Sequence, residues 1–284
     1  MRKVFEMCSD ALSVTRYYPT SFFGGIRNRK LFNVVKTCCV FIGTQGSGKT
    51  LIASLLDAHP NMIFADDLDL LRYVYAGYGK RQIYYLLLEN SRLFSKTGRN
   101  SKGFSYKVLN QWQGRYEKLH VIGDNNGVAF LHRFKNRPWL FQKLQKVIAG
   151  QIKFIHLIRN PFDNISTIFM EKKRYRCSLE LMESIEYYFS LCTTVLDIKK
   201  KLKESDIFDI KYELFVHSPT DCLMDLCHFL DVDASNNYLN NCASVVYKSP
   251  HKSSYDVPWS NELIDIVTNK MKEFPFLNGY SYED

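Results

Sequence analysis

Residues 40–51 read Val40-Phe41-Ile42-Gly43-Thr44-Gln45-Gly46-Ser47-Gly48-Lys49-Thr50-Leu51, and this stretch decides the fold. The apolar run that ends at Ile42 predicts a strand covered on both faces, as strands of parallel sheets are. The three glycines then permit a tight turn that brings backbone N–H groups close to a ligand. Apolar residues recur at helical spacing from Leu51 onward, so the turn leads into a helix whose amino end favours an anion. The letters also fit the phosphate-loop pattern G-x-x-x-x-G-K-[ST] in full.

The rest of the chain alternates between strand and helix patterns. Apolar runs predict further strands at 62–64, 119–124, 153–158 and 207–212. Helical patterns are expected at 68–76, 82–93, 138–150, after Pro161, and at 179–202, 218–230 and 261–273. This alternation predicts a three-layer α/β fold, a parallel sheet with helices on both faces. We expect a single domain over 1–284, in which residues 1–30 form an irregular lead-in that packs on the rest.

The charge balance points to anionic ligands. The chain has 38 basic and 29 acidic residues, a formal net charge of +9. A positive balance favours polyanionic substrates or nucleotides. The basic residues form only short clusters, such as 172–174 and 199–201, and we expect no nucleic-acid partner.

Cysteine usage and hydropathy indicate a compartment. None of the eight cysteines shows C-x-x-C spacing, so we expect no zinc site and no other metal. Several lie on apolar patterns, as free thiols in a reducing compartment do. No apolar run approaches the roughly 20 residues of a membrane span, and the first ten residues lack the apolar core of a signal peptide. We therefore expect a cytoplasmic protein, or one of the secretory lumen if the chain is part of a longer precursor.

The phosphate loop alone fits a small-molecule kinase or NTPase. In that interpretation Lys49 reaches the β- and γ-phosphates and Thr50 holds magnesium. Asp124, at the end of an apolar strand, is then the second partner of the metal.

A different interpretation uses more of the chain. Residues 43–51 followed by Leu55-Leu56-Asp57-Ala58-His59-Pro60 resemble the 5′-phosphosulfate loop of sulfotransferases, which use 3′-phosphoadenosine 5′-phosphosulfate (PAPS). Residues 154–169, Phe-Ile-His-Leu-Ile-Arg-Asn-Pro-Phe-Asp-Asn-Ile-Ser-Thr-Ile-Phe, resemble the 3′-phosphate strand-helix motif of that family. Lys211-Tyr212-Glu213-Leu214 is similar to the Tyr-Glu-Asp-Leu that often follows a later strand in it. The resemblance covers most of 34–284 and implies the P-loop-like sulfotransferase fold.

The resemblance also implies cofactor-binding residues. The 5′-phosphosulfate would be held by Gly46, Ser47, Gly48, Lys49 and Thr50. Arg159, at the strand end, would bind the 3′-phosphate together with Thr167 or its neighbour Ser166; an Arg fork suits a phosphate. Relatives often place basic residues of a late loop over the cofactor phosphates, which here suggests Lys248, His251 and Lys252. The alternative for that loop is an ordinary basic surface.

The catalytic residues are also inferred from the resemblance. Many relatives carry a general base eight residues after the histidine of His-Pro, and here that position is Asp67, with Asp66 as its neighbour. The alternative is that both aspartates cap the next helix. Where most relatives carry a Lys or Arg before the Ser-Gly pair, this chain has Gly46, so Lys49 would supply the cation from one turn later.

Together these features predict transfer of a sulfuryl group from PAPS to an acceptor hydroxyl, on a carbohydrate or a small alcohol or phenol. Phe104, Tyr106 and Trp112 would line an acceptor pocket or pack as part of a lid or core. The alternative functions are a phosphate-loop kinase or NTPase and a non-catalytic nucleotide binder. The oligomeric state is not predictable from the sequence.

Overall fold

The computed structural model describes residues 2–101, 103–173, 180–247 and 249–283. Its centre is a sheet of five parallel strands in the order β2-β5-β1-β6-β7. The strands are β1 (Thr37–Gly43), β2 (Met62–Ala65), β5 (Val121–Asp124), β6 (Gln151–Ile158) and β7 (Ile207–Lys211). All five predicted strands are therefore confirmed.

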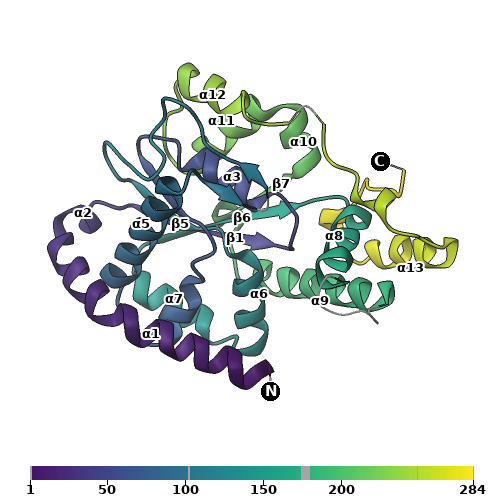
Figure 1. The fold of residues 1–284 in the computed structure, drawn as a ribbon, viewed down its shortest axis with the longest axis horizontal. Helices are drawn as coiled ribbons and strands as arrows, with labels where there is room; N and C mark the ends of the chain where they lie inside the picture. Colours follow the sequence, from purple (N-terminus) through teal and green to yellow (C-terminus); the bar gives the residue numbers. More distant parts are fainter. Residues whose placement is uncertain (1, 102, 174–179, 248, 284) are drawn as a thin grey trace.

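Helices cover both faces of this sheet, which confirms the predicted three-layer α/β fold (Figure 1). They are α1 (Arg2–Arg27), α2 (Arg29–Asn33), α3 (Lys49–Leu56), α4 (Leu70–Tyr75), α5 (Lys80–Lys96), α6 (Gly127–Asn136), α7 (Leu140–Ile148), α8 (Pro161–Lys173), α9 (Leu181–Lys199), α10 (Tyr212–His217), α11 (Pro219–Phe229), α12 (Asn236–Ala243) and α13 (Asn261–Met271). β3 (Asn100–Ser101) and β4 (Phe104–Ser105) form a separate antiparallel pair.

Alternate side chains of β1 point into two separate cores. Cys38, Val40 and Ile42 pack with residues of α4 to α7 and α9, whereas Cys39 and Phe41 pack with residues of α3, α11 and α12. All seven residues of β1 are buried, as expected for a central parallel strand. Among the described residues, no helix is both long and apolar enough to cross a bilayer.

The strand order places a ligand crevice at the end of β1. Strand β1 pairs with β5 on one side and with β6 on the other, so successive connections leave it in opposite directions. In open parallel sheets, ligands bind at such a switch point, beyond the carboxyl ends of the strands. Gly43 of β1 lies opposite Leu157 of β6, and the turns that follow both strands therefore lie next to each other.

The expected irregular lead-in over residues 1–30 is wrong, because residues 2–27 form α1 and Arg29 and Lys30 begin α2. The Gly24-Gly25 pair does not break the helix. A Cβ at Gly24 would lie 2.3 Å from the Tyr85 ring, so the missing side chain lets α1 approach α5 closely. Ser21 of α1 is buried at the same contact and accepts a hydrogen bond from Gln82 of α5 at 3.3 Å.

A buried ion pair joins the end of α3 to the chain that follows α5. Arg99 contacts the Asp57 carboxylate, with side-chain exposures of 2% and 0%. Asp57 also accepts the backbone N–H groups of Phe64 (2.6 Å) and Gly114 (2.7 Å) and the Ser91 hydroxyl (2.7 Å). One carboxylate therefore holds these segments together at the end of α3 that is opposite the phosphate loop.

Candidate nucleotide-binding site

At two of its positions, the phosphate loop has a backbone conformation that only glycine adopts readily. Gly46 has φ +71° and Gly48 has φ +91°, both in the left-handed region. A Cβ at Gly46 would lie 2.6 Å from the Thr167 methyl group, and one at Gly48 would lie 2.5 Å from the Tyr212 ring. The neighbours of the loop therefore leave no room for side chains at these positions. A larger side chain at position 46 would therefore clash with Thr167.

Donor groups converge on the amino end of α3. The hydrogen bond from the Ile52 N–H to the Gly48 carbonyl (3.2 Å) opens the helix, and the N–H groups before it have no helical acceptor. The Lys49 ammonium donates to the Thr44 carbonyl at 2.9 Å, which holds it over the loop. The Ser47 hydroxyl donates to the same carbonyl at 2.9 Å and is buried. The loop thus combines backbone donors with one ammonium group, which suits an anion.

Arg159, at the end of β6, lies against this loop. Its Nη1 donates to the Gly46 carbonyl at 2.8 Å, and its Nη2 donates to the His251 carbonyl and lies 3.3 Å from the Ser253 hydroxyl. The Tyr212 ring lies 5.5 Å from the guanidinium carbon. The Nε of Arg159 is buried and has no hydrogen-bond partner among the described residues. The two strand ends that were predicted to hold opposite ends of one nucleotide are therefore in direct contact.

Thr167 belongs to the same cluster as Arg159, and Ser166 faces elsewhere. The Thr167 hydroxyl donates to the Asp163 carbonyl at 2.9 Å and lies 3.2 Å from the Ser253 hydroxyl, which Arg159 also contacts. The Ser166 hydroxyl is fully buried and accepts the Trp259 indole N–H at 3.0 Å. Of the two alternatives for the partner of Arg159, the geometry favours Thr167.

Helix α8 anchors the phosphate loop through one face. Asn164 accepts the Thr44 hydroxyl and donates to the Gln45 carbonyl. The Gln45 amide donates to Glu171 at 2.9 Å, one helical repeat further on. Asn164, Thr167 and Glu171 recur at the three- and four-residue spacing that aligns side chains along one side of a helix. No role was predicted for Asn164 from the sequence, although its three-residue spacing from Thr167 places the two side chains on one side of a helix.

The late loop reaches the site through groups other than its lysines. The His251 carbonyl and the Ser253 hydroxyl contact Arg159, and the Ser254 N–H donates to Asp163 at 2.8 Å. Lys252 instead donates to the Glu283 carbonyl in the C-terminal tail at 3.1 Å. Lys248 lies outside the described residues. The predicted segment thus lies at the site, but Ser253, which bridges Arg159 and Thr167, has no distinctive sequence signal.

The two candidate base residues follow β2, where Asn125 holds both. The Asp67 N–H donates to Asn125 Oδ1 and Asn125 Nδ2 donates to Asp66 Oδ1, both at 2.7 Å. Asp67 is exposed and has φ +51°. Helix α4 is capped by Asp69, which accepts the Arg72 N–H at 3.3 Å. Neither Asp66 nor Asp67 is therefore the cap of that helix.

Asp124, the proposed metal partner of the kinase alternative, accepts backbone hydrogen bonds from its neighbours. It is buried and accepts the backbone N–H groups of Leu68 (3.2 Å), Leu70 (2.8 Å) and Asn126 (3.3 Å). Burial raises the pKa of Asp124 to about 7. Among the described residues no group of three or more His, Cys, Asp or Glu side chains is arranged to hold a metal ion. Asp124 thus orders the turn before α4, close to the candidate base residues.

Aromatic side chains gather beside the loop. Phe104, 46% exposed, packs edge-on against Tyr247 with ring centroids 5.7 Å apart. Burial raises the pKa of Tyr106 to about 12, and the charges of Tyr212, Tyr247 and Asp66 raise it further. Tyr106 and Tyr212 pack against the same hydrophobic core. Tyr212 in turn contacts Gly48. Phe104 and Tyr106, two of the three aromatic residues proposed for an acceptor pocket, thus lie near the loop. Trp112, the third, donates its backbone N–H to the Ala58 carbonyl after α3, at 3.1 Å, and its ring lies 5.8 Å from the Arg115 guanidinium.

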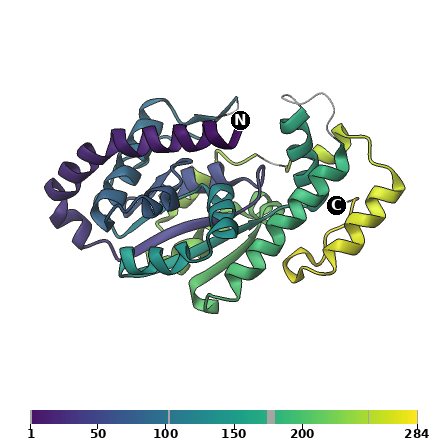
Figure 2. The ribbon, with the colours of Figure 1, turned by 90° about the horizontal axis from the view of Figure 1, so that it is seen from below.

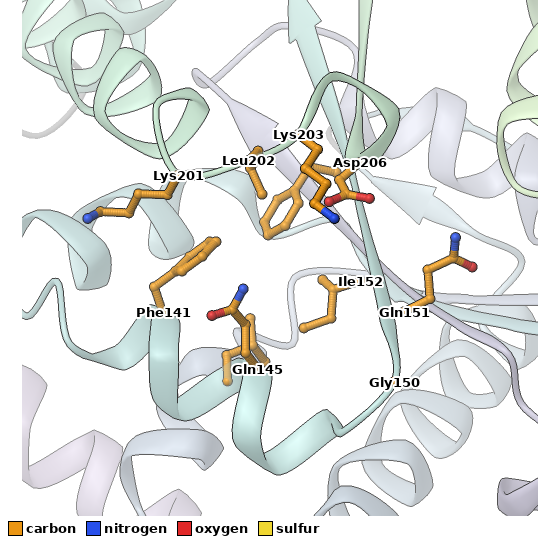
Figure 3. A pocket seen from close by; sticks show the side chains of 11 residues that line it. Phe141, Gln145, Gly150, Gln151, Ile152, Lys201, Leu202, Lys203 and Asp206 are labelled. Carbon is orange, nitrogen blue, oxygen red and sulfur yellow. The ribbon is translucent and has the colours of Figure 1, made fainter.

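A separate hollow of about 300 Å³ lies at the opposite end of β6 (Figure 3). Phe141 and Gln145 of α7, Ile152 of β6 and the turn after α9 with Lys201 and Lys203 line it. None of the predicted site residues lines this hollow. The phosphate loop and this hollow are therefore different sites.

Comparison with known proteins agrees with this architecture. The chain resembles the sulfotransferase domain from the curacin biosynthetic pathway, with 15% identity, a TM-score of 0.50, and coverage of 85% of this chain and 99% of that one. A sulfotransferase from Alicyclobacillus acidocaldarius gives 13% identity, a TM-score of 0.49 and coverage of 86% and 96%. A mouse sulfotransferase complexed with PAP gives 13% identity, a TM-score of 0.47 and coverage of 84% and 84%. A search of curated protein sequences gives no match. The model of the sulfotransferase family matches residues 40–236, and the chain belongs to that family.

Proposed function

We propose that the protein is a PAPS-dependent sulfotransferase that moves a sulfuryl group to a hydroxyl of a carbohydrate or a small alcohol or phenol. The contact between the Arg159 guanidinium and the Gly46 carbonyl, 2.8 Å, carries this proposal. It joins two donor clusters at adjacent strand ends, as a nucleotide with phosphate groups on both its 3′ and 5′ oxygens requires. We take residues 1–284 to act as one domain.

The residues present suit this cofactor. The α3 N–H groups and Lys49 offer donors for a 5′-phosphosulfate, and Thr50 extends the same turn. Arg159 and Thr167 offer a guanidinium and a hydroxyl for a 3′-phosphate. The buried Nε of Arg159 has no partner among the described residues, so a ligand oxygen there would satisfy a donor that is costly to leave unpaired.

In the proposed reaction, residues of this chain stabilise the leaving group and accept the proton of the acceptor. PAPS supplies the activated sulfuryl group. Lys49 brings a positive charge to the side of the loop where the departing phosphate gains negative charge, which lowers the barrier. Gly46 cannot carry that charge, because its Cβ position is filled by Thr167.

The proposed base is Asp67, which takes the proton from the acceptor hydroxyl at a carboxylate oxygen. Its exposure and its position directly after β2 support this role, as does the presence of another helix cap at Asp69. Asp66 is the alternative base, because Asn125 holds it beside Asp67. A positioned carboxylate contributes typically about 10²–10⁴-fold to such a step.

The aromatic residues beside the loop support an acceptor with a ring. Phe104 and Tyr247 present an exposed edge-on pair next to Tyr106. Aromatic faces bind sugar and phenol rings by stacking and edge contacts. This surface therefore suits a carbohydrate or a phenol.

We also propose that the protein works in the cytoplasm. Cys38, Cys39, Cys192, Cys222, Cys227 and Cys242 are all buried free thiols. Free thiols persist in a reducing compartment. Localisation of the tagged full chain, compared with an authentic cytoplasmic marker, tests this point.

Two measurements test the proposed function. In a thermal-shift assay 3′,5′-ADP should stabilise the protein, by about 2.7 kcal/mol at a concentration 100 times its Kd. Stabilisation by ATP–magnesium without stabilisation by 3′,5′-ADP would refute the proposal. Incubation with sulfur-labelled PAPS and a panel of sugars, alcohols and phenols should label at least one acceptor. Tight 3′,5′-ADP binding with no labelled product would favour the non-catalytic alternative.

A further inference from the structure

We propose that α1 docks this protein on an anionic lipid bilayer through its outer face, which consists of Phe22, Phe23 and Ile26 with the flanking Arg16 and Arg27. This face is distinct from the nucleotide site, and the inference does not depend on the proposed reaction.

The outer face is apolar and uncovered. Phe23 is 69% exposed, Ile26 49% and Phe22 45%. The opposite side of the helix is buried, because Ser21, Gly24 and Gly25 face α5. Both views of the ribbon show α1 at the periphery of the molecule, outside α5 (Figures 1 and 2). Large apolar side chains that gather on a surface in this way mark an interaction site rather than scattered exposure.

The charged residues that the second half of α1 and the segment after it contribute have one sign, although Glu89 of α5 lies close to Tyr85 and Arg27. No acidic residue occurs between Asp10 and Asp57, whereas Arg16, Arg27, Arg29, Lys30 and Lys36 fall in that interval. All five are exposed. Each basic residue near an anionic membrane surface contributes about 1 kcal/mol. The attraction is therefore large enough to matter beside the apolar contact.

The combination of charge and aromatic side chains identifies the partner. A nucleic acid would satisfy the basic residues but leave Phe22, Phe23 and Ile26 in water. The boundary between headgroups and acyl chains accommodates both, with the apolar face buried and the cations at the phosphates. The cytoplasmic leaflet carries the anionic lipids that this arrangement needs.

A second group of exposed aromatic residues lies on helices next to α1. Tyr75, at the end of α4, is 47% exposed, and Trp139, which precedes α7, is 50% exposed. Their rings lie 6.1 Å apart. Arg137 lies 4.7 Å from the Tyr75 ring and Lys143 lies 5.8 Å from the Trp139 ring. Helix α4 packs on both α1 and α7, and Tyr and Trp beside cations are typical of membrane interfaces.

Vesicle flotation of the full chain tests the proposal. The protein should float with vesicles of phosphatidylcholine containing phosphatidylserine and should bind vesicles of phosphatidylcholine alone at least about tenfold more weakly. Phe23→Ser combined with Ile26→Ser should weaken binding about tenfold or more, and Arg27→Glu with Lys30→Glu should weaken it further. Met224→Ser, at a side chain 50% exposed on α11, is the matched apolar control and should change nothing.

The outcomes that would overturn the proposal are equally concrete. One is that the protein does not bind the anionic vesicles. The other is that the double variant, Phe23→Ser with Ile26→Ser, binds them as tightly as the unaltered chain does. A dimer in sedimentation that depends on Phe23 would instead identify a contact between copies of the chain. Circular-dichroism melting checks that each variant folds. Phe23→Trp keeps the face apolar, and its emission should shift to the blue on anionic vesicles; no shift would refute insertion.

Discussion

Replacing Arg159 by alanine tests the two-ended grip on the nucleotide. The guanidinium contacts the Gly46 carbonyl and the Ser253 hydroxyl, 2.8 and 3.3 Å away, so it lies between the loop and the late segment. A hydrogen bond to a charged group contributes about 1.5–3 kcal/mol. Loss of this interaction with a 3′-phosphate should therefore weaken 3′,5′-ADP about 12- to 150-fold.

The assay compares two nucleotides so that a general loss of nucleotide binding cancels in the ratio of their Kd values. The Kd of 3′,5′-ADP and that of 5′-AMP are measured by calorimetry for the unaltered chain and for Arg159→Ala. Any disturbance of the loop affects the 5′-phosphate of both ligands, whereas the 3′-phosphate is present in only one. The selectivity ratio should fall about 12- to 150-fold. Arg92→Ala, which removes an exposed guanidinium paired with Glu89 on α5, is the control and should leave the ratio unchanged. An unchanged ratio in Arg159→Ala would refute the assignment.

Three further changes test the loop, the base and a buried carboxyl group. Gly46→Ala should abolish 3′,5′-ADP binding in calorimetry, since its Cβ would lie 2.6 Å from the Thr167 methyl, and Thr167→Ser in the same chain should restore part of it. Asp67→Asn should lower kcat about 10²–10⁴-fold with an unchanged Kd for 3′,5′-ADP; if Asp66→Asn does this instead, Asp66 is the base. The pKa of Asp124 is raised from 3.8 to about 7, so between these pH values the folded chain binds more protons than the unfolded chain. The free energy of unfolding should therefore fall as pH rises through this range, by at most about 1.4 kcal/mol per pH unit. Asp124→Asn should flatten this slope in urea titrations, and an unaltered slope would contradict the shift.

The central strands and the phosphate loop were predictable because their signals are local. Strand β1 and residues 153–158 of β6 are buried on both faces, and both strands are mostly apolar. The glycines and Lys49 match a short pattern whose spacing reflects one backbone conformation. Parallel pairing of β1 and β6 brings their ends together and places Arg159 against the loop. Binding of a 3′-phosphate by Arg159 stays a prediction.

The features that the sequence did not predict depend on contacts between distant segments. Helix α1 contains Pro19 and the Gly24-Gly25 pair, which look like helix breakers. The glycines are instead a close-packing surface for Tyr85. Helix α12 is short and rich in asparagine, so its apolar pattern is too weak to predict a helix. Ser253 likewise has no local signal, because its role depends on Arg159 and Thr167 coming to it.

The buried pair of Asp57 and Arg99 constrains how this chain can change over generations. Loss of one partner leaves the other charge uncompensated, at a cost of about 3–5 kcal/mol. A typical domain has only about 5–15 kcal/mol of net stability to lose. If the pair were replaced by two apolar residues one substitution at a time, the protein with a single substitution would fold poorly. The two positions are therefore expected to mutate jointly or not at all.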